Sequence, residues 1–158
     1  MANTASMCTS FMGELLTATH NFGVAPIRAA TTADTFKGAL YLTTATINAS
    51  TTAYSATGEV SGTGYTAGGV SITNATAPSS TNSSSTAGVA YWTPSASITY
   101  TSVTLSTAFD TVLMYNSTQS NKAVAVYTFG SQTVTAGTFT LTMPSNTTTT
   151  ALLRLATT

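Results

Sequence analysis

The stretch that decides the fold is LMYNSTQSNKAVAVYTFG, residues 113–130. Two apolar runs, Thr111–Tyr115 and Ala123–Phe129, are separated here by the polar segment NSTQSNK. Apolar runs joined by a short polar loop predict an antiparallel β-hairpin. The second run is almost continuously apolar, which indicates a central strand of a sheet.

Further strand patterns lie on both sides of this hairpin. Short runs with period-two alternation or β-branched and aromatic enrichment predict strands. The expected strands are Phe36–Leu42, Glu59–Gly64, Val70–Ile72, Val89–Trp92, Ile98–Leu105, Thr138–Met143 and Ala151–Leu155. Gly68 and Gly69 permit positive φ at successive positions, so we expect a tight hairpin between Glu59–Gly64 and Val70–Ile72. The apolar phase slips between Tyr100 and Val103, which predicts a bulge or bend there.

Three polar segments are expected as connections. Asn74–Gly88 contains Pro78 and a Ser/Thr/Asn cluster, which is typical of an exposed loop. Gly130–Gly137 is expected as a polar turn, and Thr147–Thr150 as a loop. Seven to nine short strands with frequent turn signals predict a mainly β fold, an antiparallel β-sandwich, of which a jelly-roll-like arrangement is one form.

The N-terminus follows a different pattern. In Thr4–His20, Met7, Phe11 and Leu15 recur at helical spacing, and Gly23 and Pro26 would end a helix. We therefore expect an N-terminal helix and linker arm over residues 1–33 and a β-sandwich domain over residues 34–158.

The charge content of the chain excludes some functions. Its 158 residues include four Lys or Arg and four Asp or Glu, so 5% are charged and the net charge is zero. An average domain is about 25% charged. Four scattered bases cannot form the basic stripe that nucleic-acid binding requires, so we expect no nucleic-acid partner. No apolar run approaches the ~18–20 residues of a membrane span, so we expect no membrane partner.

The sequence offers little for catalysis or metal binding. One cysteine, Cys8, and one histidine, His20, leave no metal-ligand spacing, and we expect no metal or cofactor. His20 is expected to cap the helix or lie at the surface. Glu59 and Asp110 could form a glycosidase pair only if the fold brought them together, and turn-end carboxylates usually accept backbone N–H groups. We therefore expect a protein that is not an enzyme.

Two groups of residues are candidates for partner binding. Met7, Phe11 and Leu15 form an apolar stripe wider than a free surface helix tolerates. Tyr91 and Trp92 form either part of the core or an interface, or a platform on which sugars stack. The alternative of a carbohydrate-binding β-sandwich depends on this aromatic pair and on exposed positions for Tyr54 and Tyr65.

The segment TTAYSATGEVSGTGYTAGG, residues 51–69, gives the chain a family resemblance. Together with KGALYL (37–42), NKAVAVYTFG (121–130) and TVTAGTFTLTMP (133–144), it resembles the small Thr/Ala-rich structural proteins of tailed-bacteriophage virions. The resemblance implies a non-enzymatic virion protein made in the host cytoplasm. Within that class, the neutral Thr-rich surface, the N-terminal arm and the compact fold favour a capsid decoration or cement protein that contacts the major capsid protein or other virion proteins. The alternative is a tail, neck or fibre-base component.

The surface composition adds an expectation about self-association. The chain has no net charge and contains 38 threonines, so little charge repulsion opposes contact between copies. Closed symmetric oligomers are the usual result of such contact. We expect a homotrimer.

Overall fold

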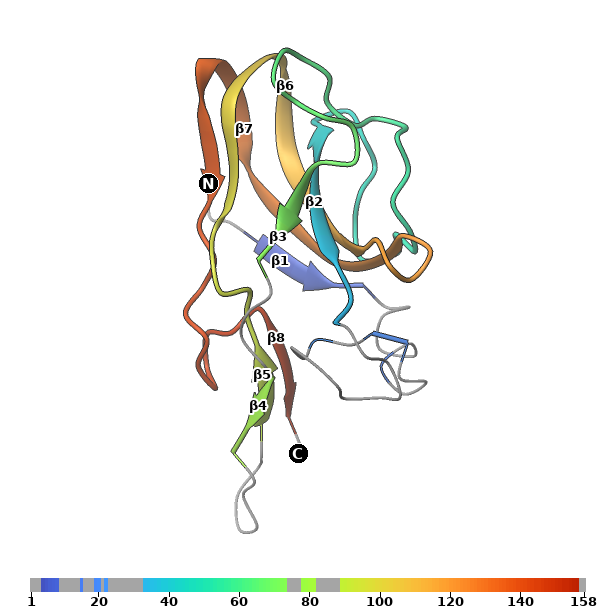
Figure 1. The fold of residues 1–158 in the computed structure, drawn as a ribbon, viewed down its shortest axis with the longest axis vertical. Coiled ribbons are helices and arrows are strands. Elements are labelled where there is room, and N and C mark those ends of the chain that lie inside the picture. Colours follow the sequence, from blue (N-terminus) through green and yellow to red (C-terminus); the bar gives the residue numbers. More distant parts are fainter. Residues whose placement is uncertain are drawn as a thin grey trace.

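The structure is a computed structural model that describes residues 4–8, 15, 19, 20, 22, 33–73, 78–81 and 89–156, without the side chains of residues 4–7 and 80. This part of the chain contains eight strands: β1 (Thr4–Met7), β2 (Phe36–Leu42), β3 (Val70–Ile72), β4 (Ser79–Ser80), β5 (Val89–Trp92), β6 (Ile98–Asn116), β7 (Lys122–Leu141) and β8 (Leu153–Ala156). They form a five-stranded sheet in the order β1-β7-β6-β2-β3 and a three-stranded sheet in the order β4-β5-β8. All pairings are antiparallel, as expected for the predicted mainly β fold (Figure 1).

The long hairpin β6–β7 dominates the structure. Its strands have 19 and 20 residues, so each combines two strands that the sequence pattern separates. The expected turn at Gly130–Gly137 is wrong, because this segment lies within β7. Register shifts interrupt the pairing at several points, including the predicted one between Tyr100 and Val103, where Ser102 has a φ of 54°. Bulges bend paired strands without ending them, so polar and glycine residues mark a bend here instead of a turn.

The bent hairpin folds back over its own sheet and creates a sandwich-like core. The Tyr100 hydroxyl, from the outer half of β6, donates a hydrogen bond of 2.8 Å to the carbonyl oxygen of Gly38 in β2. Phe139, from the outer half of β7, packs edge-on against Phe109 with ring centroids 5.1 Å apart. Two layers of one hairpin thus enclose the buried side chains, which include Leu40 and Leu113.

The strands around the glycine pair are arranged differently from the prediction. β3 pairs with β2, matching Phe36 with Ile72, and not with Glu59–Gly64. Residues of that segment make only isolated bridges, such as Thr63 with Thr104. Gly68 and Gly69 do have positive φ, at 88° and 72°. A Cβ on Gly69 would lie 1.7 Å from the carbonyl oxygen of Gly38, so this glycine permits close backbone approach to β2.

The N-terminal segment begins as a strand and not as the predicted helix. β1 pairs with β7 from Thr4 opposite Thr128 to Met7 opposite Ala125. Pairing satisfies the backbone of both strands at the edge of β7, which overrides a helical side-chain period in a short segment. Of the rest of the predicted helix, Cys8, Leu15, Thr19 and His20 are described, and Leu15 is helical. Phe11 and the other residues lie outside the described part.

The three-stranded sheet extends below the larger one in Figure 1 and carries the C-terminal strand β8. Val89–Trp92 is the strand that the sequence predicts, and β5 pairs with β8 from Val89 opposite Ala156 to Trp92 opposite Leu153. Within the expected loop Asn74–Gly88, Ser79 and Ser80 form β4 instead, and residues 74–77 and 82–88 lie outside the described part.

Candidate interaction site

One face of the three-stranded sheet is apolar and borders a cavity. Strand register places Ala90 opposite Leu155 and Trp92 opposite Leu153. Since alternate residues of a strand face the same side, these four side chains share one face. The wall opposite includes Leu15 and Phe22 of the N-terminal segment, so residues far apart in the sequence enclose the site.

The cavity has a volume of about 150 Å³. Its lining residues are Leu15, Phe22, Pro78, Ala90, Tyr91, Trp92, Leu153 and Leu155. The structure therefore brings together three of the five residues that the sequence suggests for partner binding, Leu15, Tyr91 and Trp92. Of the other two, Met7 lies on β1 with its side chain outside the described part, and Phe11 is not described.

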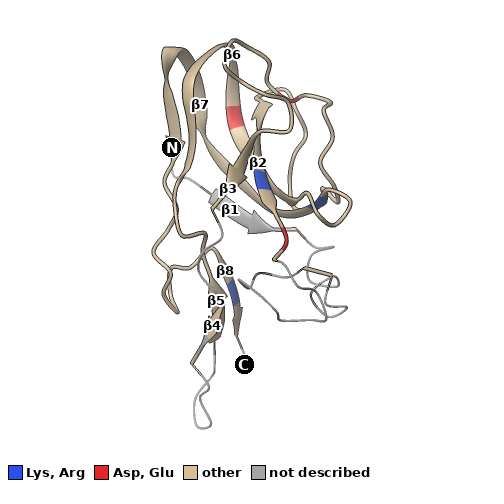
Figure 2. Ribbon diagram, in the orientation of Figure 1, with Lys and Arg blue, Asp and Glu red and all other residues tan. Residues whose placement is uncertain are grey.

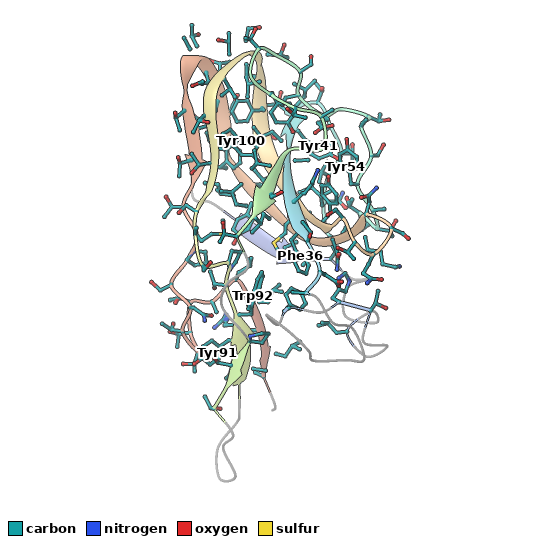
Figure 3. The ribbon with its side chains drawn as sticks, viewed as in Figure 1. Phe36, Tyr41, Tyr54, Tyr91, Trp92 and Tyr100 are labelled. Atoms are coloured by element: carbon teal, nitrogen blue, oxygen red, sulfur yellow. The ribbon has the colours of Figure 1, made fainter. Side chains whose placement is uncertain are left out.

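Trp92 lines this cavity and belongs to the core. Its side chain is 2% exposed and meets Phe22 edge-on, with ring centroids 4.8 Å apart (Figure 3). Phe22 in turn stacks on Phe36 of β2 at 4.9 Å. A buried indole offers no open face for a sugar to stack on, so the suggested platform reduces to the half-buried Tyr91. Sequence reasoning missed Phe22 and Leu155, for which only their apolar character was available as a signal.

The segment Thr51–Gly69, which carries the family resemblance, is organised around Glu59. The Tyr54 and Tyr65 hydroxyls each donate to the Glu59 carboxylate at 2.7 Å, and the Gly68 N–H donates to it at 2.8 Å. Tyr54 and Tyr65 are half-buried, so the expectation that they are exposed is wrong. The Tyr65 hydroxyl also accepts the N–H of Leu40 in β2 at 3.0 Å, which ties the loop to the sheet.

Two further tyrosines attach the same loop to the strands beneath it. Tyr115 donates to the Gly68 carbonyl oxygen at 2.7 Å, and its ring stacks on that of Tyr54 at 4.7 Å. Tyr41 donates to the carbonyl oxygen of Ser55. Burial raises the pKa of Tyr41 to about 12. Burial, and next the hydrogen bond to Glu59, also raise the pKa values of Tyr54 and Tyr65. These hydroxyls stay protonated and act as structural donors.

His20 is buried, so the expected surface position is wrong. The alternative role, a cap of the predicted helix, concerns residues outside the described part. The His20 Nδ1 lies 3.0 Å from Nδ2 of Asn116, which also donates to the Asp34 carboxylate at 2.8 Å. The oxygen of the Asn116 amide accepts the N–H groups of Thr118 and Gln119, each at 3.1 Å. This polar cluster joins the N-terminal segment to the β6–β7 loop.

Charged side chains are sparse over the described surface (Figure 2). Glu59 is used by the tyrosine network, and Asp110 accepts a hydrogen bond of 2.8 Å from the Thr111 hydroxyl. In the described ranges, no group of three or more His, Cys, Asp or Glu side chains is placed to hold a metal ion. Nor does this part of the chain contain a helix long and apolar enough to cross a membrane.

Comparison of the chain with protein-family models, with curated proteins and with solved structures gave no match. The apolar cavity and the Glu59 network are therefore interpreted from their own geometry.

Proposed function

We propose that this protein is a non-enzymatic structural component of a tailed-phage virion, and that it decorates and stabilises the capsid by contact with the major capsid protein. The observation that carries the proposal is that the Thr51–Gly69 motif forms a hydrogen-bonded structural unit. Tyr54 and Tyr65 both donate a hydrogen bond to Glu59, and the Tyr65 hydroxyl accepts the N–H of Leu40 in β2. The motif therefore holds its own loop on β2. The residues that resemble the virion family thus have a structural use in this chain.

The character of the surface supports the same proposal. The exposed positions of the outer half of β7 are largely threonine and serine, with no charged residue between Ala123 and Leu153. A hydroxyl-rich, uncharged surface can form hydrogen bonds with another protein surface without burying a charge. Such a surface suits permanent attachment in a particle, where repulsion between free molecules is no longer needed for solubility.

A tail, neck or fibre-base component would have the same surface, and copy number distinguishes the two assignments. Purified virions analysed by quantitative mass spectrometry should contain this chain at a copy number close to that of the major capsid protein. A small fraction of that number would favour the tail, neck or fibre base. Absence of the chain from purified virions would contradict both assignments.

The stabilising role has its own test. Particles assembled without this protein should release their genome at a lower temperature than complete particles, and addition of the purified protein should restore the difference. If particles with and without it open at the same temperature, the protein is not a cement. Carbohydrate binding is not retained as a second proposal, because Trp92, on which it chiefly depended, is 2% exposed.

A further inference from the structure

A second hollow, the β7–β8 groove, lies between the end of β7 in the larger sheet and β8 in the smaller one. It has a volume of about 500 Å³, and every residue that lines it belongs to the described part of the chain. Leu141, Met143, Pro144 and Leu152 supply apolar walls, and Tyr127 and Arg154 supply the strongest polar groups. The groove therefore combines apolar surface with a positive charge.

Arg154 is the one charged residue of this groove and is exposed. Its Nη1 donates to the carbonyl oxygen of Thr149 at 2.7 Å and, more weakly, to that of Thr148 at 3.5 Å. These bonds fix the guanidinium through one of its three nitrogens. Among the residues that the structure describes, no carboxylate pairs with Arg154, so its Nε and Nη2 donors are free.

The Tyr127 hydroxyl is the second donor on the lining. The Tyr127 side chain is 6% exposed, and within the described ranges its hydroxyl donates only to the Met143 sulfur, at 3.8 Å. A thioether sulfur is a weak acceptor, whereas buried hydroxyls usually have a strong one. Burial raises the pKa of Tyr127, so the hydroxyl keeps its proton and is available to a better acceptor.

These groups determine the chemistry of a ligand. A guanidinium and a phenol hydroxyl both donate, and the groove contains no acid, so the complementary ligand is an anion. A planar carboxylate matches the fork of Nε and Nη2 on the guanidinium of Arg154. The apolar walls favour a carboxylate attached to a short apolar group over a fully hydrated inorganic ion.

The openness of the groove indicates where that carboxylate comes from. Arg154 and the neighbouring Thr142 and Thr150 are all exposed. An exposed pair of arginine and carboxylate binds weakly by itself, so it is effective as one contact within a larger protein interface. The hydroxyls of the two threonines can donate to or accept from the backbone of a protein partner.

The acids of this chain that the structure describes are already engaged. Asp34 accepts from Asn116, and Glu59 accepts from two tyrosines and a backbone N–H. Asp110 accepts from the Thr111 hydroxyl. A different protein is therefore the better source of a free carboxylate than a second copy of this chain.

We propose that the β7–β8 groove binds an Asp or Glu side chain, together with an adjacent apolar side chain, on the surface of another protein. The carboxylate pairs with Nε and Nη2 of Arg154 and accepts the Tyr127 hydroxyl, while the apolar side chain packs on Leu141 and Leu152. This inference deepens the proposed function, on which it rests for the existence of a protein partner.

Titration of the purified full chain with isovalerate, followed by NMR, tests the site without any virion. Isovalerate should bind with a millimolar dissociation constant and shift the methyl signals of Leu141 and Met143, whereas isovaleramide, its uncharged analogue, should not. Arg154→Gln should weaken binding about tenfold or more, and Tyr127→Phe, which keeps the ring, about threefold or more. Lys37→Gln removes a charge from β2, outside the groove, and should bind like the wild type.

Thermal unfolding verifies that each variant is folded. Equal binding of isovalerate and isovaleramide, or equal binding of isovalerate to the wild type and to both groove variants, would overturn the site. Because this measurement uses the free protein, its failure is distinct from a failure of the virion assignment.

Competition for particles that lack this chain tests the partner. Wild type and Arg154→Gln, added together in limiting amounts, should attach in a ratio of about ten to one, as expected from the loss of a charge-assisted contact. Equal attachment would overturn the assignment of the groove to a protein partner. Isovalerate bound with micromolar affinity would also overturn it, since the groove would then hold a free carboxylate without help from a larger interface.

Discussion

At the scale of single residues, the carboxylate of Glu59 organises a whole loop. It receives two phenol hydroxyls and one backbone N–H, each within 2.8 Å. Hydrogen bonds to an ionised acceptor are stronger than neutral ones, and the network connects residues from both ends of the segment Thr51–Gly69. This explains why an acid stands here in a chain that has only four.

Replacement of Glu59 should therefore destabilise the protein. Glu59→Ala leaves the Tyr54, Tyr65 and Gly68 donors without their acceptor and should lower the free energy of unfolding by about 3 kcal/mol. Glu59→Gln keeps an acceptor oxygen and should cost about half as much. Urea denaturation measures both changes. Equal stability of Glu59→Ala and the wild type would show that the network does not hold the loop.

Gly69 should tolerate no side chain. Its φ is +72°, and a Cβ would lie 1.7 Å from the carbonyl oxygen of Gly38. Gly69→Ala should lower the free energy of unfolding by roughly 3 kcal/mol or more, because backbone strain adds to a steric clash with a buried strand. Gly130→Ala is the matched control. A Cβ there meets nothing within 4 Å, so that variant should lie within about 0.5 kcal/mol of the wild type in thermal unfolding.

The buried tyrosines predict a loss of stability at alkaline pH. The pKa of Tyr41 rises from 10.0 to about 12, and those of Tyr65 and Tyr100 also rise, all first because of burial. A raised pKa means that the folded state holds a proton that the unfolded state loses. This stabilisation is complete below pH 10 and decreases as the pH rises from about 10 to 12.

Tyrosinate absorbance and Trp92 emission, followed together during titration, check this prediction. The two signals should change in one cooperative step above pH 10, because Tyr41 ionises mainly in the unfolded chain. A smooth tyrosine titration centred near the ordinary pKa of 10.0, in a protein that keeps its native Trp92 emission, would contradict the burial of these hydroxyls.

At the scale of elements, Cys8 and Phe22 of the N-terminal segment are part of the core. Cys8 is fully buried and its N–H reaches the Val124 carbonyl oxygen at 3.3 Å, while Phe22 is 8% exposed between Phe36 and Trp92. Deletion of residues 2–30 would therefore uncover the Phe36 and Trp92 rings, and we expect it to destabilise the β core.

A single substitution tests this role of the N-terminal segment. Phe22→Ala should lower the free energy of unfolding by about 3 kcal/mol, the usual cost of removing a buried phenylalanine. It should also shift the emission of Trp92 to longer wavelength, because the indole loses its edge-on neighbour and meets water. Unchanged stability together with unchanged emission would mean that the segment is not seated on the core. Leu152→Ala, at a partly buried position on the same core, provides a comparison and should cost less.

At the scale of the whole molecule, the scarcity of charge predicts an association that does not depend on salt. No charged residue lies between Ala123 and Leu153, a stretch that contains most of β7. Sodium chloride at 0.5 M shortens the Debye length to about 4 Å, which weakens exposed ion pairs but leaves apolar contacts intact. The association constant of the expected homotrimer, measured by sedimentation, should change less than about threefold between low and high salt. A steep loss of association at high salt would show that ionic contacts hold the copies together.

The sequence by itself determined those features that depend on local chemistry. Period-two alternation identified β2, a short apolar run identified β5, and the phase slip between Tyr100 and Val103 identified a bulge. Gly68 and Gly69 were recognised as positive-φ positions because few other residues adopt that backbone. These signals lie within a few residues of the feature they specify, and one chain is enough to read them.

Only the tertiary structure decided which segments meet. Polar residues at Gly130–Gly137 mark a turn and a bend equally well, so the pattern could not show that β7 continues through them. The helical period of Met7, Phe11 and Leu15 did not reveal that Thr4–Met7 pairs with the edge of β7. The apolar cavity joins Leu15 to Leu155, at opposite ends of the chain. Such contacts depend on the free energy of the assembled core, which short-range sequence periodicity does not contain.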